Sequence, residues 1–326
     1  MSKESRKSNL GSFIKNKKEK LFSEHYKYKS KQYLSSFFVS LFRSVLIIGI
    51  SYLILMPVFT KISASLMSIE DLTNQTVHWI PRNPNLENYA NVIYEMEYFQ
   101  ALFNTFLLTF GISVLQVFSS TLTGYGLARF NFKGSNLVFG LVLFTLVVPP
   151  YMIMVPQYMN FRFFDILGII PEGGFNLINS YWPFILPALT GNGLRNGLFI
   201  FVMRQFFKGM PDNLEEAAYV DGAGPFRTFL RVMLPGATSS IVIVFLFSFV
   251  WMWTNEYQIS LFLSNDSAFL PTLLADLENV VWYDDPQRFS LMSNAAMLLF
   301  IAPLLLLYMF MQRYFIESIE RTGIVG

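Results

Sequence analysis

The chain has 326 residues, of which 53% are hydrophobic and only 14% charged, and it contains 35 Phe. This is far more apolar material than the core of one soluble domain needs, so a lipid-embedded protein is the first expectation. The absence of cysteine excludes a disulfide framework, a cysteine nucleophile and a cysteine metal site.

Residues 1–35 form a basic segment ahead of the first long apolar stretch. Ten Lys or Arg and three Glu fall within residues 1–31, although the net charge of the whole chain is only +2. Such a segment could bind nucleic acid, bind an anionic lipid surface, or hold the N-terminus in the cytoplasm. We favour the topology signal and expect no nucleic-acid partner. No small-residue cleavage site follows the apolar stretch from Ser44 to Phe59, so this stretch should remain as an anchor.

Six stretches have the roughly 20 mostly apolar residues that a helix needs to cross a bilayer. They lie near 38–60, 103–127, 136–158, 181–205, 238–258 and 291–312. Lys and Arg are enriched in cytoplasmic loops. The links 61–100, 159–180 and 259–290 are acidic, 128–135 is basic and 206–237 is balanced. The sequence therefore predicts an all-α, multi-pass protein of the cytoplasmic membrane with six spans, both termini inside, and 128–135 and 206–237 on the cytoplasmic side.

Two of the predicted spans contain breaks. Pro149 and Pro150 fall inside the third span, where each removes a backbone donor and disfavours helix before it, so we expect the helix to break there.

The fourth predicted span contains Pro187 and then the polar run 191–197, which includes Asn192, Arg195 and Asn196. Polar, irregular backbone at membrane depth is tolerated where it is buried in protein or lines a water-filled cavity. We favour a substrate pathway here over a structural knot of hydrogen bonds between helices.

The fifth span ends in an aromatic and polar cluster, Trp251 to Tyr257. An aromatic belt at the outer interface is one interpretation. The other is that rings such as Trp253 stack against sugar faces while Asn255 and Glu256 bind hydroxyl groups. Both alternatives stay open, and Trp253 and Asn255 are candidates for the substrate pathway.

The predicted cytoplasmic loop 209–236 carries the clearest local signals. Pro211 suits the first turn of a helix and Gly222 suits its end, while Asp212, Glu215 and Glu216 suit the positive end of the helix dipole. Four residues of this short helix share one face by their i, i+3, i+4, i+7 spacing, and small alanines there would allow close approach of another surface. They are Leu214, Ala217, Ala218 and Asp221.

A second amphipathic helix is predicted from Pro225 to Pro235, leading into the fifth span. Four apolar residues form its stripe: Phe226, Phe229, Leu230 and Met233. A hairpin lying on the lipid surface would explain the stripe, but the acids of the first helix are poorly suited to an anionic leaflet.

These residues resemble a known family. Glu216-Ala217-Ala218, three residues, Gly222, nine residues and Val232-Met233-Leu234-Pro235 are similar to the EAA signature of bacterial ABC importer permeases, with Val in place of Ile. Short matches at 85–89, 128–130, 204–207 and 312–315 extend the resemblance over residues 36–326, to the MalG-like permeases of the carbohydrate-uptake group. The tail is less similar, with Ser318 where glycine is expected.

The resemblance implies a type I permease fold whose 209–236 loop forms a coupling helix held in a cleft of a separate ATPase. Glu216 and Gly222 would fix its seating and its turn. The expected partners are a second, homologous permease, two ATPase subunits, an extracellular solute-binding protein and the bacterial membrane. ATP and Mg would be bound by the ATPase, since this sequence has no phosphate-binding GxxxxGK[ST] motif. The implied cargo is a sugar or oligosaccharide.

Other functions were weighed against this one. An ion-coupled secondary transporter usually needs acids within the membrane, and Glu256, near a span end, is the candidate here. A membrane enzyme is disfavoured because His25 and His78 are far apart and no acid–base pair or metal-ligand spacing emerges. An ABC permease for a non-sugar solute and a structural scaffold remain alternatives.

Overall fold

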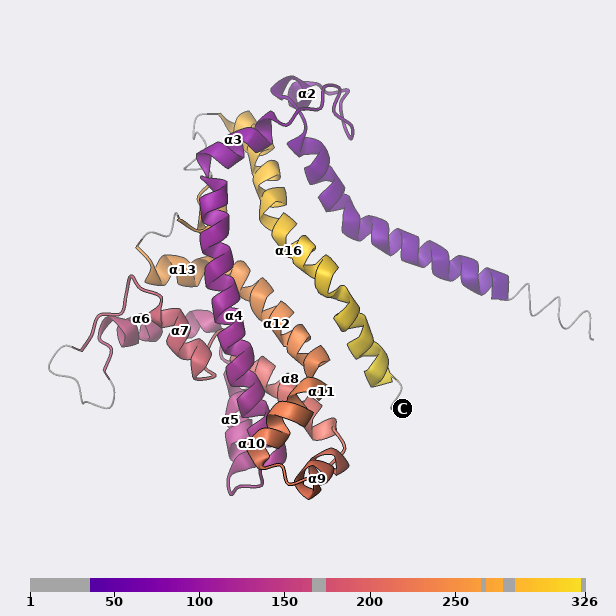
Figure 1. Ribbon diagram of the computed structural model, residues 1–326. Coiled ribbons are helices and arrows are strands. Elements are labelled where there is room, and N and C mark those ends of the chain that lie inside the picture. Colours follow the sequence, from indigo (N-terminus) through magenta and orange to yellow (C-terminus); the bar gives the residue numbers. More distant parts are fainter. Residues whose placement is uncertain (1–35, 166–173, 265–267, 278–284, 324–326) are drawn as a thin grey trace, which may run out of the picture. The chain divides into compact units, whose positions relative to one another are not determined.

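The computed structural model describes residues 36–165, 174–264, 268–277 and 285–323, with the backbone alone for 315–323 (Figure 1). The predicted basic segment 1–35 and the end of the tail lie outside the described residues. Within them the chain is helical, and its only strand-like feature is an isolated bridge between Phe164 and Phe175.

The chain divides into two compact units, 1–61 and 62–326. The first unit contains most of the helix Ser36–Ser65, which covers the first predicted span. An apolar helix of 30 residues is long enough to cross a bilayer.

The predicted count of six spans is not confirmed. In the described residues three helices are long and apolar enough to cross a membrane, or five if two bent helix pairs each count as one span. The predicted fourth span, 181–205, is not among them. Residues 190–195 divide it into α7 (Trp182–Leu189) and α8 (Asn196–Gly209), so neither helix is long enough by itself.

The predicted break at Pro149 and Pro150 is confirmed. Helix α5 (Ser135–Val147) ends just before the prolines, and the chain continues through the short 3₁₀ helix η1 (Pro150–Ile153) into α6 (Met154–Arg162). The helices on the two sides of the break are bent by 98°.

Helix α4 (Tyr98–Arg129) is the centre of the second unit. It packs against α7, α8 and α12 (Thr238–Trp253), and α12 also packs against the last helix, α16 (Pro286–Gly323). The buried face of α4 is unusually polar for an apolar helix, and small polar side chains of this kind let helices approach closely in membranes. Its members include Thr105, Thr109, Ser113, Gln116, Ser119, Ser120 and Thr121.

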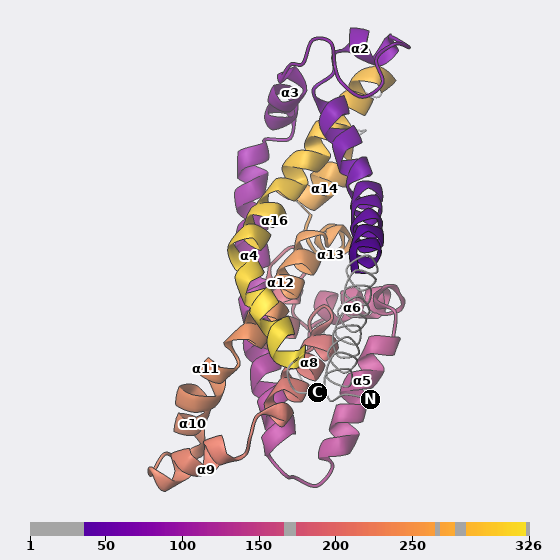
Figure 2. The same cartoon turned by 90° about the vertical axis from the view of Figure 1, so that its right-hand side faces the viewer.

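The two ends of this unit carry different short elements (Figures 1 and 2). One end has α2 (Ile69–Thr73), α3 (Glu87–Glu95) and the start of α16, with α14 (Leu270–Ala275) packed on α16. The other end has the turn between α4 and α5 together with α9 (Asn213–Val220). The two links predicted to be cytoplasmic, 128–135 and 206–237, thus lie at the same end. Which side of the membrane this end faces stays a prediction.

After α9 the chain returns to α12 through three short helices in sequence. These are α10 (Pro225–Thr228), the π-helical turn η2 (Phe229–Met233) and α11 (Leu234–Gly236). The chain then bends by 75° into α12, and α13 (Glu256–Phe262) follows it.

Candidate functional site

The loop 209–236 is held at its start by Arg129, the last residue of α4. Arg129 forms an ion pair with Asp212, lies 3.8 Å from the Glu215 carboxylate, and donates a hydrogen bond to the Met210 carbonyl at 2.6 Å. Tyr125, one turn earlier in α4, donates to Glu215 at 2.9 Å. Helix α9 is therefore fixed to the end of α4 by two side chains.

The predicted end of this helix is confirmed at Gly222. Its φ of +80° lies in the left-handed region that favours glycine. The amides of Gly222 and Ala223 donate back to the carbonyls of Tyr219 and Ala218, which closes the helix in the manner common for C-terminal glycines. Open space surrounds the position where a Cβ of residue 222 would lie.

The face predicted for α9 is corrected in one respect. Ala218 is only 7% exposed, because α9 packs against η2 and α10, whereas Ala217 and Asp221 are exposed and Leu214 is 41% exposed. Leu214, Ala217, Ala218 and Asp221 therefore do not form one exposed surface. Glu216 lies on the exposed side, together with Val220, which is 87% exposed.

The second predicted helix is also present in altered form, since a π-helical turn interrupts it. Phe229 and Met233 are buried in a cluster with Tyr125 and Phe207, and the Tyr125 and Phe229 rings are 4.7 Å apart. Phe226 and Leu230 are instead 72% and 43% exposed. The predicted single stripe is thus divided between an inward and an outward face, each with i, i+4 spacing.

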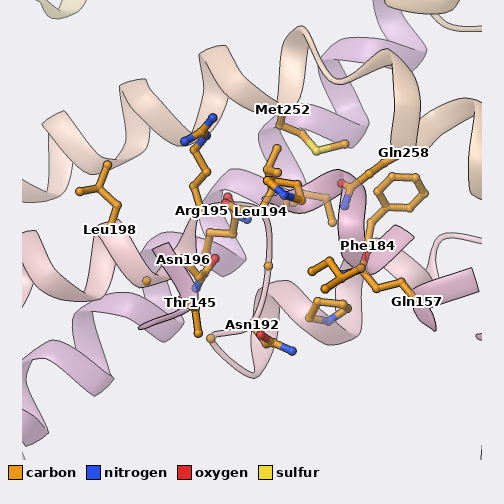
Figure 3. A pocket seen from close by; sticks show the side chains of 18 of the residues that line it. Thr145, Gln157, Phe184, Asn192, Leu194, Arg195, Asn196, Leu198, Met252 and Gln258 are labelled. Carbon is orange, nitrogen blue, oxygen red and sulfur yellow. Dashed lines mark hydrogen bonds between the residues drawn. The ribbon is translucent and has the colours of Figure 1, made fainter. Parts of the chain in front are cut away.

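A cavity of about 340 Å³ lies beside the middle of α4 (Figure 3). Its walls come from α4, α5, α6, α7, the α7–α8 loop, the start of α8, the end of α12 and α13. Figure 3 shows Asn192 and Arg195 from the α7–α8 loop and Asn196 from α8, together with Gln157 of α6 and Gln258 of α13.

The α7–α8 loop reaches this place through two left-handed residues, Gly191 at φ +75° and Arg195 at φ +57°. Between them Gly193 lies directly against Gln116 of α4, since a Cβ on residue 193 would be 2.6 Å from the Gln116 Nε2. A Cβ at residue 193 would therefore force the Gln116 side chain to move.

Two polar side chains fix the loop and α12 on α4. Gln116 donates from Nε2 to the Leu194 carbonyl at 3.1 Å and accepts from the Ser248 hydroxyl at 2.5 Å. Asn196 donates to the Ser119 and Ser120 hydroxyls at 3.1 and 3.2 Å. The sequence left open whether this polar run forms a network of hydrogen bonds between helices. That network is present, and it forms one wall of the cavity.

Two amide oxygens at the cavity lack a partner in the described chain. Asn196 is 1% exposed, and its Oδ1 accepts no hydrogen bond; the buried Oε1 of Gln157 is in the same situation. Buried polar atoms are nearly always paired with protein, water or ligand. Both oxygens are enclosed by protein atoms and are not exposed to the cavity itself.

The predicted pathway residues fall into two groups. Asn192, Arg195 and Asn196 line the cavity. Trp253 is fully buried, donates its indole N–H to the Phe300 carbonyl at 3.2 Å and stacks on Phe249. Asn255 is 4% exposed and caps the start of α13 by accepting from the Gln258 amide.

Neither Trp253 nor Asn255 belongs to the wall of this cavity. Asn255 still acts on it indirectly, because its Nδ2 donates to the side-chain oxygen of Gln258 at 2.5 Å.

Several residues of the site were missed from the sequence. Gln116 could have been found as a large amide in the middle of an apolar span, where polar side chains are expensive and usually functional or structural. Gln157 follows the proline break and Arg129 lies in the short family match at 128–130, whereas Gln258 and Tyr125 gave no distinct signal.

Comparisons with known proteins agree with this architecture. Residues 120–321 match the family described as binding-protein-dependent transport system inner membrane component. The probable ABC transporter permease protein PH1036 of Pyrococcus horikoshii is 26% identical over 86% of this chain and 93% of its own length.

The sn-glycerol-3-phosphate transport system permease protein UgpE of Yersinia enterocolitica is 27% identical over 84% of this chain and 93% of its own length. The UgpE of Brucella abortus is 27% identical over 85% and 94%.

Among solved structures, a chain of a bacterial ABC transporter that imports the acidic polysaccharide alginate shares the fold. The TM-score is 0.69 at 19% identity, over 86% of this chain and 98% of that chain. The resemblance inferred from residues 216–235 is thereby confirmed. The chain belongs to the family of binding-protein-dependent transport system inner membrane components, and it is a multi-pass permease subunit of an ABC importer rather than an enzyme.

Proposed function

We propose that this permease imports a sugar or oligosaccharide by alternating access, driven by a separate ATPase that docks on the loop 209–236. The observation that carries the proposal is the arrangement of α9. Its inner side is tied to α4 through Arg129 and Tyr125, while Glu216, Ala217 and Val220 are exposed at the end of the unit.

This arrangement can transmit a movement of the ATPase from α9 to the cavity along two paths. An ATPase that closes around α9 displaces its exposed side. Arg129 and Tyr125 pass the displacement to α4, and the packing of η2 on Tyr125 and Phe207 passes it through α11 to α12. Because α4 and α12 both line the cavity, moving them as rigid bodies changes access to it.

The assembly that we propose contains a second, homologous permease, two ATPase subunits that bind ATP and Mg, and an extracellular solute-binding protein. The docking end faces the cytoplasm, as do the basic segment 1–35 and both termini. The docking residues are Leu214, Glu216, Ala217, Asp221 and Gly222, with Ala218 supporting α9 from inside.

The cargo is proposed from the site and from the relatives. Amides and an arginine line the cavity, and such groups bind hydroxylated solutes. Relatives are named for sn-glycerol-3-phosphate, and the structural neighbour imports a polysaccharide. The pathway includes Asn192, Arg195 and Asn196, with Trp253 and Asn255 supporting it from the core.

The test is uptake by the complete importer in proteoliposomes. ATP on the side of the ATPase should drive accumulation of a solute delivered by the binding protein. Omitting the ATPase subunits should abolish it. Uptake that persists without the ATPase and follows an imposed proton or sodium gradient would instead show an ion-coupled carrier.

A further inference from the structure

The wall of the cavity has a single sign of charge. Of the residues that line it, Arg195 alone carries a full charge at neutral pH, and no Asp or Glu is among them. In the described chain the Arg195 guanidinium has no carboxylate within ion-pair distance and instead lies 4.8 Å from the centroid of the Trp251 ring. Its charge is therefore available to a ligand.

A second positive feature lies at the same place. Helix α8, 14 residues long, begins at Asn196, and its first residues line the cavity. The N-terminus of a helix carries a partial positive charge that favours anions, and here the amides of Asn196, Leu198 and Phe199 already donate to the carbonyls of Gly193 and Arg195. Arg195 directly precedes this end, so the two features reinforce each other.

Uncharged polar side chains complete the wall. Thr145, Asn192 and Gln258 line the cavity together with Arg195, and such side chains can form hydrogen bonds with hydroxyl groups (Figure 3). A volume of about 340 Å³ suits a small solute, since ligand pockets usually measure about 300–1,000 Å³.

From this arrangement we infer that the cavity selects a hydroxylated solute carrying an anionic group, a phosphate or a carboxylate, with Arg195 beside the start of α8 at the anion and polar side chains of the wall, such as Asn192 and Gln258, at hydroxyls. This rests on the proposed function. A neutral sugar would leave the arginine without a counter-charge in a region where charge is expensive.

The experiment uses the complete importer in proteoliposomes and measures ATP-driven uptake of matched solutes: glucose, glucose 6-phosphate and glucuronate, and glycerol with glycerol 3-phosphate. Wild type should take up at least one anionic member faster than its neutral counterpart. Uptake of the phosphate alone, of the carboxylate alone, or of both identifies the anionic group.

Variants assign the preference to this cavity. Arg195→Gln should lower uptake of the anionic solute roughly tenfold to a hundredfold, because a charge-assisted hydrogen bond is lost. Arg195→Lys should lose less, since the charge remains without the planar fork. Arg162→Gln removes an exposed arginine at the end of α6 that is outside the cavity wall, and it should leave uptake unchanged.

Gln258→Glu provides an independent test that leaves Arg195 in place. The carboxylate can still accept from Asn255 Nδ2, but it adds negative charge to the wall, so anionic uptake should fall while any neutral uptake persists. Faster uptake of neutral members by wild type, or unchanged anionic uptake in Arg195→Gln, would overturn the inference and leave the proposed function intact. No ATP-driven uptake of any cargo that the binding protein accepts would overturn both.

Discussion

Arg129 at the end of α4 forms an ion pair with Asp212, the residue just before α9, across 83 positions of sequence. The Arg129 side chain is 7% exposed, whereas that of Asp212 is 81% exposed. The buried arginine is thus the anchor of the pair, and it also binds the Met210 carbonyl and approaches Glu215.

Replacing Arg129 by Ala should loosen α9 from α4. The Met210 carbonyl and the Glu215 carboxylate would lose a charged partner, which costs roughly 1–3 kcal/mol for charge-assisted bonds. We expect the purified subunit to melt at lower temperature and the importer to hydrolyse ATP with little uptake. The thermal midpoint in detergent and the ratio of uptake to hydrolysis measure these effects.

Lys133→Ala is the matched control for Arg129→Ala. It removes an exposed cation from the turn that follows α4, at the same end of the unit, and should change neither quantity. Equal losses in the two variants would show that general charge at this end matters rather than the attachment of α9.

A larger side chain at residue 222 would meet no steric clash, but the backbone conformation there disfavours any residue except glycine. At φ +80° a β-branched residue costs roughly 1–2 kcal/mol, so Gly222→Val should distort the end of α9. We expect the variant to reach the membrane but to bind and couple the ATPase poorly. Co-purification of the ATPase, and its stimulation by substrate, are the measurements.

Gly224 provides the control for Gly222, because open space also surrounds its Cβ position while its φ of −77° suits any residue. Gly224→Ala should retain coupling. A normal, substrate-stimulated ATPase with Gly222→Val would refute the role of the turn.

Two adjacent glutamates should respond differently to charge reversal. Glu215 is an internal residue, with a side chain 13% exposed that accepts from Tyr125, so Glu215→Lys would place a cation beside Arg129. Removing one partner of a buried pair typically costs about 3–5 kcal/mol, and this variant should lower the thermal stability of the subunit itself.

Glu216 is exposed, and Glu216→Lys should change stability by less than about 0.5 kcal/mol. The effect of Glu216→Lys should appear instead as weaker binding of the ATPase, measured by pull-down from membranes. A Glu216→Lys permease that retains a normal, substrate-stimulated ATPase would remove Glu216 from the docking surface.

Local chemistry explains why some elements could be predicted from sequence. Two consecutive prolines remove two backbone donors and disfavour helix before them, and a glycine after a short acidic helix marks its end, so the break after α5 and the turn at Gly222 followed directly. The EAA spacing likewise identified the family, which later comparison confirmed.

Which side of an element is buried depends on its partners, and here the sequence was insufficient. Ala217 and Ala218 are chemically identical, yet only Ala218 is buried, because η2 lies on that side. Sugar stacking by Trp253 was one of two interpretations that the sequence left open, and the structure shows its ring enclosed by Phe249 and Phe300. Packing between residues that are far apart in the sequence cannot be inferred from the spacing of residues within one element.

Glycines on the two sides of α4 provide a last test of the fold. A Cβ on Gly124 would lie 2.7 Å from the Met203 Cβ and 2.9 Å from the Arg204 nitrogen, so α4 and α8 are in contact there without room for a methyl group. Gly124→Ala should force the helices apart at a cost of roughly 1–3 kcal/mol.

Gly111, on the same helix, has open space, and Gly111→Ala should stabilise α4 by roughly 0.5–1 kcal/mol through lower backbone entropy in the unfolded chain. The thermal midpoints of the two variants in detergent should therefore move in opposite directions, and a Gly124→Ala midpoint equal to wild type would contradict the packing of α8 on α4 at this point.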